Sequence, residues 1–70
     1  MTKNWNLYIV RNEAKHSQAF VAKKLGISKQ RYSLKELGKA TFTITEGKIL
    51  AELYGMTLDE LFSTEIKIGS

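Results

Sequence analysis

The side chains best able to do chemistry are cations, and they are concentrated in the first half of the chain. Residues 1–39 carry nine Lys or Arg against two carboxylates, a net charge of +7. Residues 40–70 carry two Lys against five carboxylates, a net charge of −3, so the 70 residues total +4. A basic surface of this kind attracts polyanions, above all the phosphates of nucleic acids. The alternative is a mixed surface whose charges only interact with water.

Covalent and metal chemistry have few candidates. The chain has no Cys, its carboxylates are scattered, and its single His is His16. A structural zinc site draws on clustered Cys and His ligands, and a nucleophilic Ser or Thr requires a neighbouring base. The sequence indicates neither arrangement, so we expect no enzymatic activity, no metal and no cofactor. We expect His16 to be a surface or capping residue.

Two short helices joined by a tight turn position the basic residues. Ser17 is placed to cap a helix over residues 18–25, and Gly26 follows where a left-handed residue ends a helix. Ser28 is placed to cap a second helix over residues 29–37. Such a pair crosses steeply, and its second helix can enter the major groove of DNA.

Three further helices are expected around this pair. The first covers residues 4–14, and the residues of its core face are Leu7, Val10, Arg11 and Ala14. Thr43 and Glu46 have the spacing of a capping box that opens a helix ending at Tyr54. Thr57 and Glu60 have the same spacing before a short helix, whose expected buried residues are Leu58, Leu61 and Phe62.

One string of residues carries a family resemblance. Its members are Ser17-Gln18, Val21-Ala22, Leu25-Gly26-Ile27-Ser28, Tyr32-Ser33, Glu36 and Gly38. This string resembles the DNA-binding domain of the Cro and lambdoid-repressor family, also called the xenobiotic-response-element (XRE) class. The resemblance extends from Arg11 to Phe62 and covers about residues 7–62. It implies an all-α bundle of five short helices that contains a helix-turn-helix.

The resemblance also implies how the protein would contact double-stranded DNA. The residues implied to face the bases are Lys29, Gln30, Ser33 and Leu34. Gln can pair with adenine, Lys can donate to guanine, and Leu can contact a thymine methyl group. The residues implied to contact phosphates are Ser17, Gln18, Lys24, Arg31 and Lys39. Arg11 and Glu36 match positions that form a structural ion pair.

Some positions depart from the family pattern. Leu34 replaces a polar residue, Leu37 replaces an asparagine, and Lys35 occupies a position that is usually apolar and buried. Gly47 replaces a large apolar residue, which would suit either close packing or a later helix start. His16 stands where leucine is common.

The departures leave a rival hypothesis open. Leu34 and Leu37 would also suit a protein partner, such as a companion repressor that this protein modulates as an anti-repressor or co-repressor. The group Trp5, Tyr8 and Ile9 lies off the expected core face of the first helix. It would either cover the edge of the core or add to an interface. An antitoxin is a third, weaker alternative.

The leading hypothesis is a small phage or prophage Cro-like repressor that binds an operator as a homodimer. We expect one domain over residues 1–63 and a tail over 64–70, which is either frayed or a strand across a dimer. No apolar run is long enough for a membrane span and no signal peptide is evident. We therefore expect a cytoplasmic protein with no membrane contact and no small-molecule effector.

Overall fold

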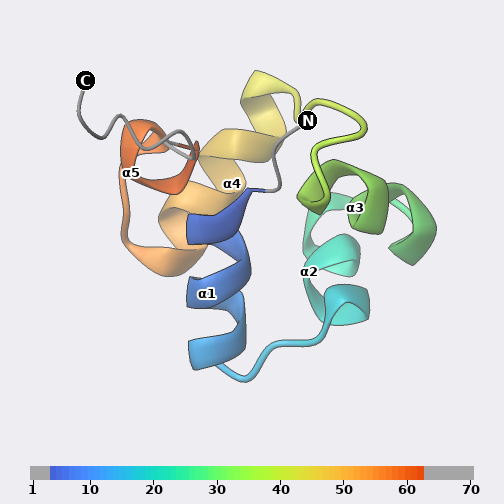
Figure 1. Cartoon of the computed structure of the whole chain (residues 1–70), viewed down its shortest axis with the longest axis horizontal. Coiled ribbons are helices and arrows are strands. Elements are labelled where there is room, and N and C mark those ends of the chain that lie inside the picture. The colour runs from blue at the N-terminus through green and yellow to red at the C-terminus, as the bar shows by residue number, and fades with distance from the viewer. Residues whose placement is uncertain (1–3, 63–70) are drawn as a thin grey trace.

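The computed structural model describes residues 4–62, which form five helices (Figure 1). The helices are α1 (Trp5–Glu13), α2 (Gln18–Leu25), α3 (Lys29–Glu36), α4 (Ile44–Tyr54) and α5 (Leu58–Phe62). The α2–α3 pair lies on one side of the molecule, and α1, α4 and α5 lie together on the other. The predicted all-α fold is therefore confirmed. None of the helices within residues 4–62 is long and apolar enough to cross a membrane.

Both helices of the helix-turn-helix begin where their capping residues predict. The Ser17 hydroxyl accepts a hydrogen bond from the Phe20 amide at 3.0 Å, and the Ser28 hydroxyl accepts one from the Arg31 amide at 3.1 Å. Gly26 ends α2 with a φ of +76°, in the left-handed region that favours glycine. The boundaries of α2 match the prediction, whereas α3 ends one residue early, at Glu36.

Both predicted capping boxes are present. The Thr43 hydroxyl accepts from the Glu46 amide at 3.0 Å, and the Glu46 carboxylate accepts from the Thr43 amide at 2.9 Å. Thr57 and Glu60 form the same reciprocal pair at 2.9 and 3.0 Å. Each box satisfies two amides that have no partner within the helix, which explains where α4 and α5 begin.

The core draws one or two apolar side chains from every helix. Its fully buried members are Leu7, Val21, Ala22, Tyr32, Leu50 and Leu61. Burying an apolar side chain of this size stabilises a fold by about 1.5 to 3 kcal/mol. These contacts hold the helix-turn-helix against α1, α4 and α5, so the core sets the position of α3.

Two predicted core residues lie elsewhere. Ala14 is exposed, because α1 ends at Glu13 and Ala14 is already its C-terminal cap. Leu58 is 38% exposed, because it opens α5 at the rim of the domain and covers Gly47 rather than the core. The tail predicted over residues 64–70 lies outside the described residues.

Gly47 allows α4 and α5 to approach closely. A Cβ atom at this position would lie 2.9 Å from Leu58 Cδ2 and 3.5 Å from Phe62 Cε2. The large residue common in the family would therefore displace α5. The close-packing interpretation is confirmed, and the alternative of a late helix start is wrong because α4 begins at Ile44.

Candidate nucleic-acid interface

One face of α3 points away from the core. Tyr32, Lys35 and Glu36 are buried, and at 3.6 residues per turn the opposite face carries Gln30, Leu34 and Leu37. A shallow hollow of about 370 Å³ lies on this face. Its lining residues are Gln18, Lys29, Gln30, Ser33 and Leu34. The structure thus brings the four predicted base-reading residues together, and their contact with DNA stays a prediction.

The predicted phosphate-contacting residues fall into two groups. Lys24, Arg31 and Lys39 are exposed, on α2, on α3 and in the loop after α3. The Lys24 ammonium lies 5.2 Å from the centre of the Phe20 ring. Ser17 and Gln18 already have partners within the protein. The Ser17 hydroxyl caps α2, and the Gln18 amide donates to Glu36.

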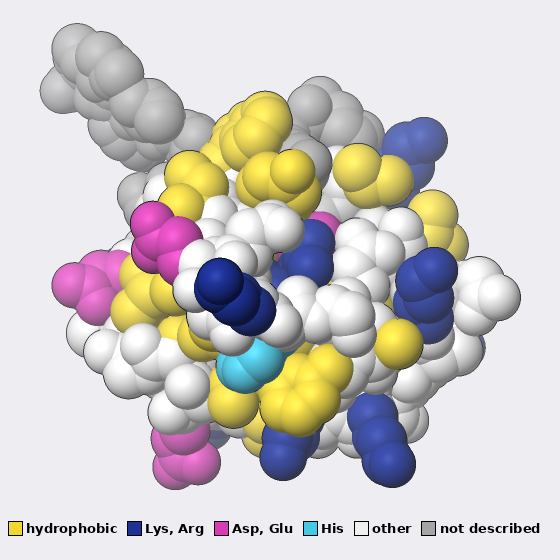
Figure 2. All heavy atoms as spheres, turned by 90° about the horizontal axis from the view of Figure 1, so that it is seen from below, with side chains coloured by type: hydrophobic (Ala, Val, Ile, Leu, Met, Phe, Trp, Pro, Cys, Tyr) yellow, Lys and Arg dark blue, Asp and Glu magenta, His cyan; other side chains and the backbone are white. Residues whose placement is uncertain are grey.

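The surface of the helix-turn-helix carries no exposed carboxylate. Between Glu13 and Glu46 the only acidic residue is Glu36, which is buried. The exposed cations of the same stretch are Lys15, Lys23, Lys24, Lys29, Arg31 and Lys39. Within residues 4–62 the exposed acids are Glu13, Glu52, Asp59 and Glu60, on α1, α4 and α5. In Figure 2 the acidic side chains gather on the left, whereas most Lys and Arg lie on the right and below.

The predicted ion pair between Arg11 and Glu36 is present and buried. Arg11 Nε lies 2.7 Å from Glu36 Oε2, and Arg11 Nη2 lies 3.1 Å from Glu36 Oε1. The pair is therefore bidentate, the geometry that gives strong charge-assisted hydrogen bonds. Gln18 Nε2 and the Tyr32 hydroxyl donate to the same carboxylate, each at 2.9 Å.

These donors decide the charge state of Glu36. Burial alone would raise the pKa of this carboxyl, but the hydrogen bonds from Arg11, Gln18 and Tyr32 outweigh burial and hold the pKa below its usual value. The hydrogen bond from Arg11 to Glu36 also raises the pKa of the guanidinium. The pair therefore stays ionised at neutral pH, and one charged carboxylate joins α1, α2 and α3.

A second buried ion pair is one that the sequence did not predict. Lys35 Nζ lies 2.6 Å from Glu46 Oε1, which links α3 to the first turn of α4. The Lys35 ammonium also lies 5.7 Å from the centre of the Phe42 ring, within cation–π range. Burial would raise the pKa of Glu46, but the hydrogen bonds from Lys35 and the Thr43 amide lower it. The sign of this ion pair in the sequence was Lys35 itself, because that position is usually apolar in the family.

His16 is half-buried between α2 and α4. Its Nδ1 lies 2.9 Å from the Tyr54 hydroxyl, and its ring centre lies 4.4 Å from that of Phe20. The expectation of a surface or capping residue did not include this packing of the imidazole between two helices. Within residues 4–62, no three His, Cys, Asp or Glu side chains come together as a metal site.

Apolar side chains also reach the surface. Leu34 and Leu37 are 46% and 40% exposed, more than any other leucine of the chain. On α1, Trp5 and Ile9 are about half exposed, and Tyr8 is half-buried with its ring edge-on to Trp5. α3 thus turns both leucines away from the core.

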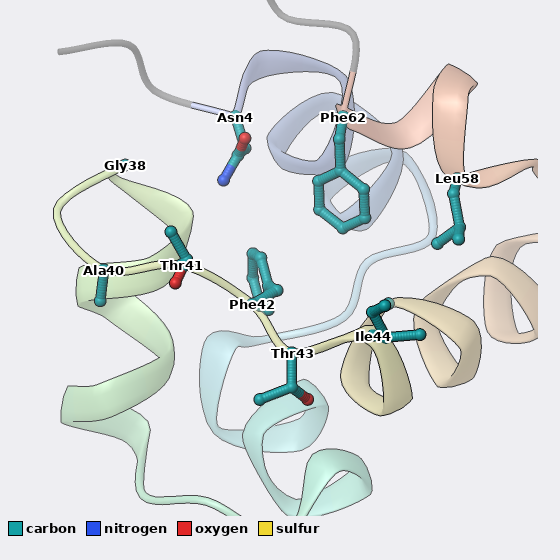
Figure 3. A pocket seen from close by; sticks show the side chains of 10 residues that line it. Asn4, Gly38, Ala40, Thr41, Phe42, Thr43, Ile44, Leu58 and Phe62 are labelled. Atoms are coloured by element: carbon teal, nitrogen blue, oxygen red, sulfur yellow. The ribbon is translucent and has the colours of Figure 1, made fainter.

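A second hollow, of about 380 Å³, lies between the loop after α3 and the start of α5 (Figure 3). Phe42 and Phe62 face each other there with ring centres 5.4 Å apart. The remaining lining residues are Asn4, Gly38, Ala40, Thr41, Thr43, Ile44, Gly47 and Leu58. This hollow has no charged side chain in its lining, so it offers no cation that could neutralise a phosphate.

Comparison with known proteins agrees with this geometry. The model of the helix-turn-helix family matches residues 7–61, which include all five helices except the ends of α1 and α5. The chain therefore belongs to the XRE-type helix-turn-helix family, and it is a DNA-binding regulator of that type. A search of curated proteins found no match.

Proposed function

We propose that the protein is a Cro-like repressor that inserts α3 into the major groove of an operator and thereby blocks a promoter. The observation that supports this most is the outward face of α3, where side chains able to read bases line one hollow. The surrounding surface is basic and free of exposed carboxylates. The protein would bind as a dimer, with one α3 per half-site and half-sites about 34 Å apart.

Each side chain has a defined role in this proposal. Lys29, Gln30 and Ser33 form hydrogen bonds with base edges. Lys24, Arg31 and Lys39 contact phosphates, which orient the protein without reading sequence. Gln18 holds α3 through Glu36 and lines the hollow, and in this proposal it also contacts the phosphate backbone.

The test separates base readout from phosphate contact. We expect Lys29→Ala or Gln30→Ala to weaken specific binding by about 1 to 3 kcal/mol and to leave non-specific binding nearly intact. We expect Lys39→Ala to weaken both. Titrations of the full chain with operator and with unrelated duplex would measure this, with Lys48→Ala on α4 as the exposed control. Unchanged operator choice in the Lys29 and Gln30 variants would contradict readout by α3.

A second candidate function is docking onto a companion repressor, and the exposure of Leu34 and Leu37 favours it. Leu34→Asp should then abolish that complex, while folding stability changes by less than about 0.5 kcal/mol, as is usual at exposed positions. A gel-shift assay with and without the neighbouring repressor would distinguish the two functions. If this protein shifts the DNA band without the neighbouring repressor, docking onto that repressor is excluded as its function.

A further inference from the structure

We propose that Leu34 is a specificity residue that reads the 5-methyl group of a thymine in each operator half-site. This inference rests on the proposed function and adds which base of the operator one side chain reads. Leu34 lies on the outward face of α3 and is 46% exposed. Its isobutyl group would have to be covered when α3 meets DNA.

The surroundings of Leu34 define what can cover it. The other four residues that line the hollow, Gln18, Lys29, Gln30 and Ser33, are polar. Leu34 is thus the one apolar lining residue in a hollow that otherwise presents hydrogen-bonding groups. A partner that fits this hollow has many polar groups and one small apolar group at the position of Leu34.

The major groove of DNA has this character at a thymine. Its base edges present acceptors and donors, and the 5-methyl group of thymine is the apolar group among them. At the same place cytosine carries only a hydrogen atom, so leucine finds no methyl group to contact there. Leu34 therefore favours a T·A pair through the methyl contact.

Leu37 has the same side chain and similar exposure but does not line the hollow. It follows the last residue of α3 as the C-terminal cap. We assign the thymine contact to Leu34 alone. Leu37→Ala is therefore the matched control, since it removes the same atoms from the same exposed face.

The experiment removes single methyl groups from DNA. The full-length chain selects its preferred duplex from a randomised pool, and each thymine of the selected site is then replaced by deoxyuridine. This base keeps the hydrogen bonds of thymine and lacks only the methyl group. We expect the wild type to lose about fourfold in affinity at one thymine of each half-site, the effect of uncovering one methyl-sized group.

The variants assign that loss to one residue. In Leu34→Ala the same deoxyuridine substitution should cost nothing further, because the contact is already gone and the two changes are not additive. In Leu37→Ala the fourfold loss should remain. A circular dichroism spectrum and melting curve like those of the wild type would show that each variant is folded.

Two results would overturn the inference in distinguishable ways. If binding is sequence-specific but no deoxyuridine substitution weakens it, the thymine contact alone is overturned. The thymine contact is also overturned if the deoxyuridine substitution still weakens binding by Leu34→Ala about fourfold. A pool from which no preferred sequence emerges would overturn the proposed function together with this inference. In that case the exposed leucines would belong to a protein interface.

Discussion

Glu36 is a residue on which the position of α3 depends. It is the last residue of α3, and its carboxylate accepts hydrogen bonds from Arg11 on α1, Gln18 on α2 and Tyr32 on α3. Its side chain is only 2% exposed, so water cannot replace a lost donor. A change at this residue should therefore alter both folding and the orientation of the DNA-binding face.

A double-mutant cycle tests this residue. Arg11→Ala and Glu36→Ala should each lower the free energy of unfolding by about 3 to 5 kcal/mol, because each leaves an unpaired buried charge. The double variant should lose much less than the sum, since it leaves neither charge behind. Urea unfolding would measure the cycle, with Glu52→Ala as the exposed control. Additive losses would mean that the two side chains do not interact.

At the scale of elements, Lys35 and Glu46 couple α3 to the start of α4. Glu46 Oε1 accepts both from Lys35 Nζ at 2.6 Å and from the Thr43 amide at 2.9 Å. One carboxylate therefore completes the capping box and neutralises a cation at a core position. This geometry explains how a lysine is accommodated where an apolar residue is usual.

Lys35→Met should expose what this coupling contributes. The variant leaves the Glu46 carboxylate without its cation, and we expect the free energy of unfolding to fall by about 1.5 to 3 kcal/mol. Adding Glu46→Gln should recover most of the loss, because glutamine preserves the capping box and no buried charge remains. Thermal and urea unfolding would report both changes, and Lys48→Met, exposed on α4, is the control. A double variant no more stable than Lys35→Met would contradict the coupling.

The sequence predicted those elements whose signals are local. Each capping hydroxyl accepts a hydrogen bond from an amide only three residues later in the chain. The starts of α2 to α5 were therefore evident from the sequence. The Arg11–Glu36 pair spans 25 positions, and only the family resemblance predicted it.

Other contacts could not be predicted, because their partners belong to other helices. That Gly47 packs against Leu58 in particular, and that Lys35 pairs with Glu46, depends on how helices pack, which no local pattern records. The roles of Lys29, Gln30 and Leu34 on DNA stay predictions for a similar reason. The sequence and the fold place these side chains on one surface, whereas readout depends on a second molecule.

At the scale of the whole molecule, folding separates the charges that could bind DNA from those that stabilise the fold. Arg11 and Lys35 are buried against Glu36 and Glu46. The other cations of the helix-turn-helix remain exposed, and the exposed acids among the described residues lie on α1, α4 and α5. The net charge of +4 therefore understates the positive potential of the α2–α3 side.

This separation predicts how binding depends on salt. Each phosphate that a cation neutralises releases counterions, so the logarithm of the binding constant should fall by about 0.9 for each unit of log salt concentration per contact. Lys24→Ala, Arg31→Ala and Lys39→Ala should each reduce this slope by about 1 per protomer bound. Fluorescence titrations between low and moderate salt would measure the slopes. Lys48→Ala lies away from the α2–α3 side, so its slope should equal that of the wild type. A flat dependence in the wild type would contradict binding through this surface, because contacts with phosphates cannot be independent of salt.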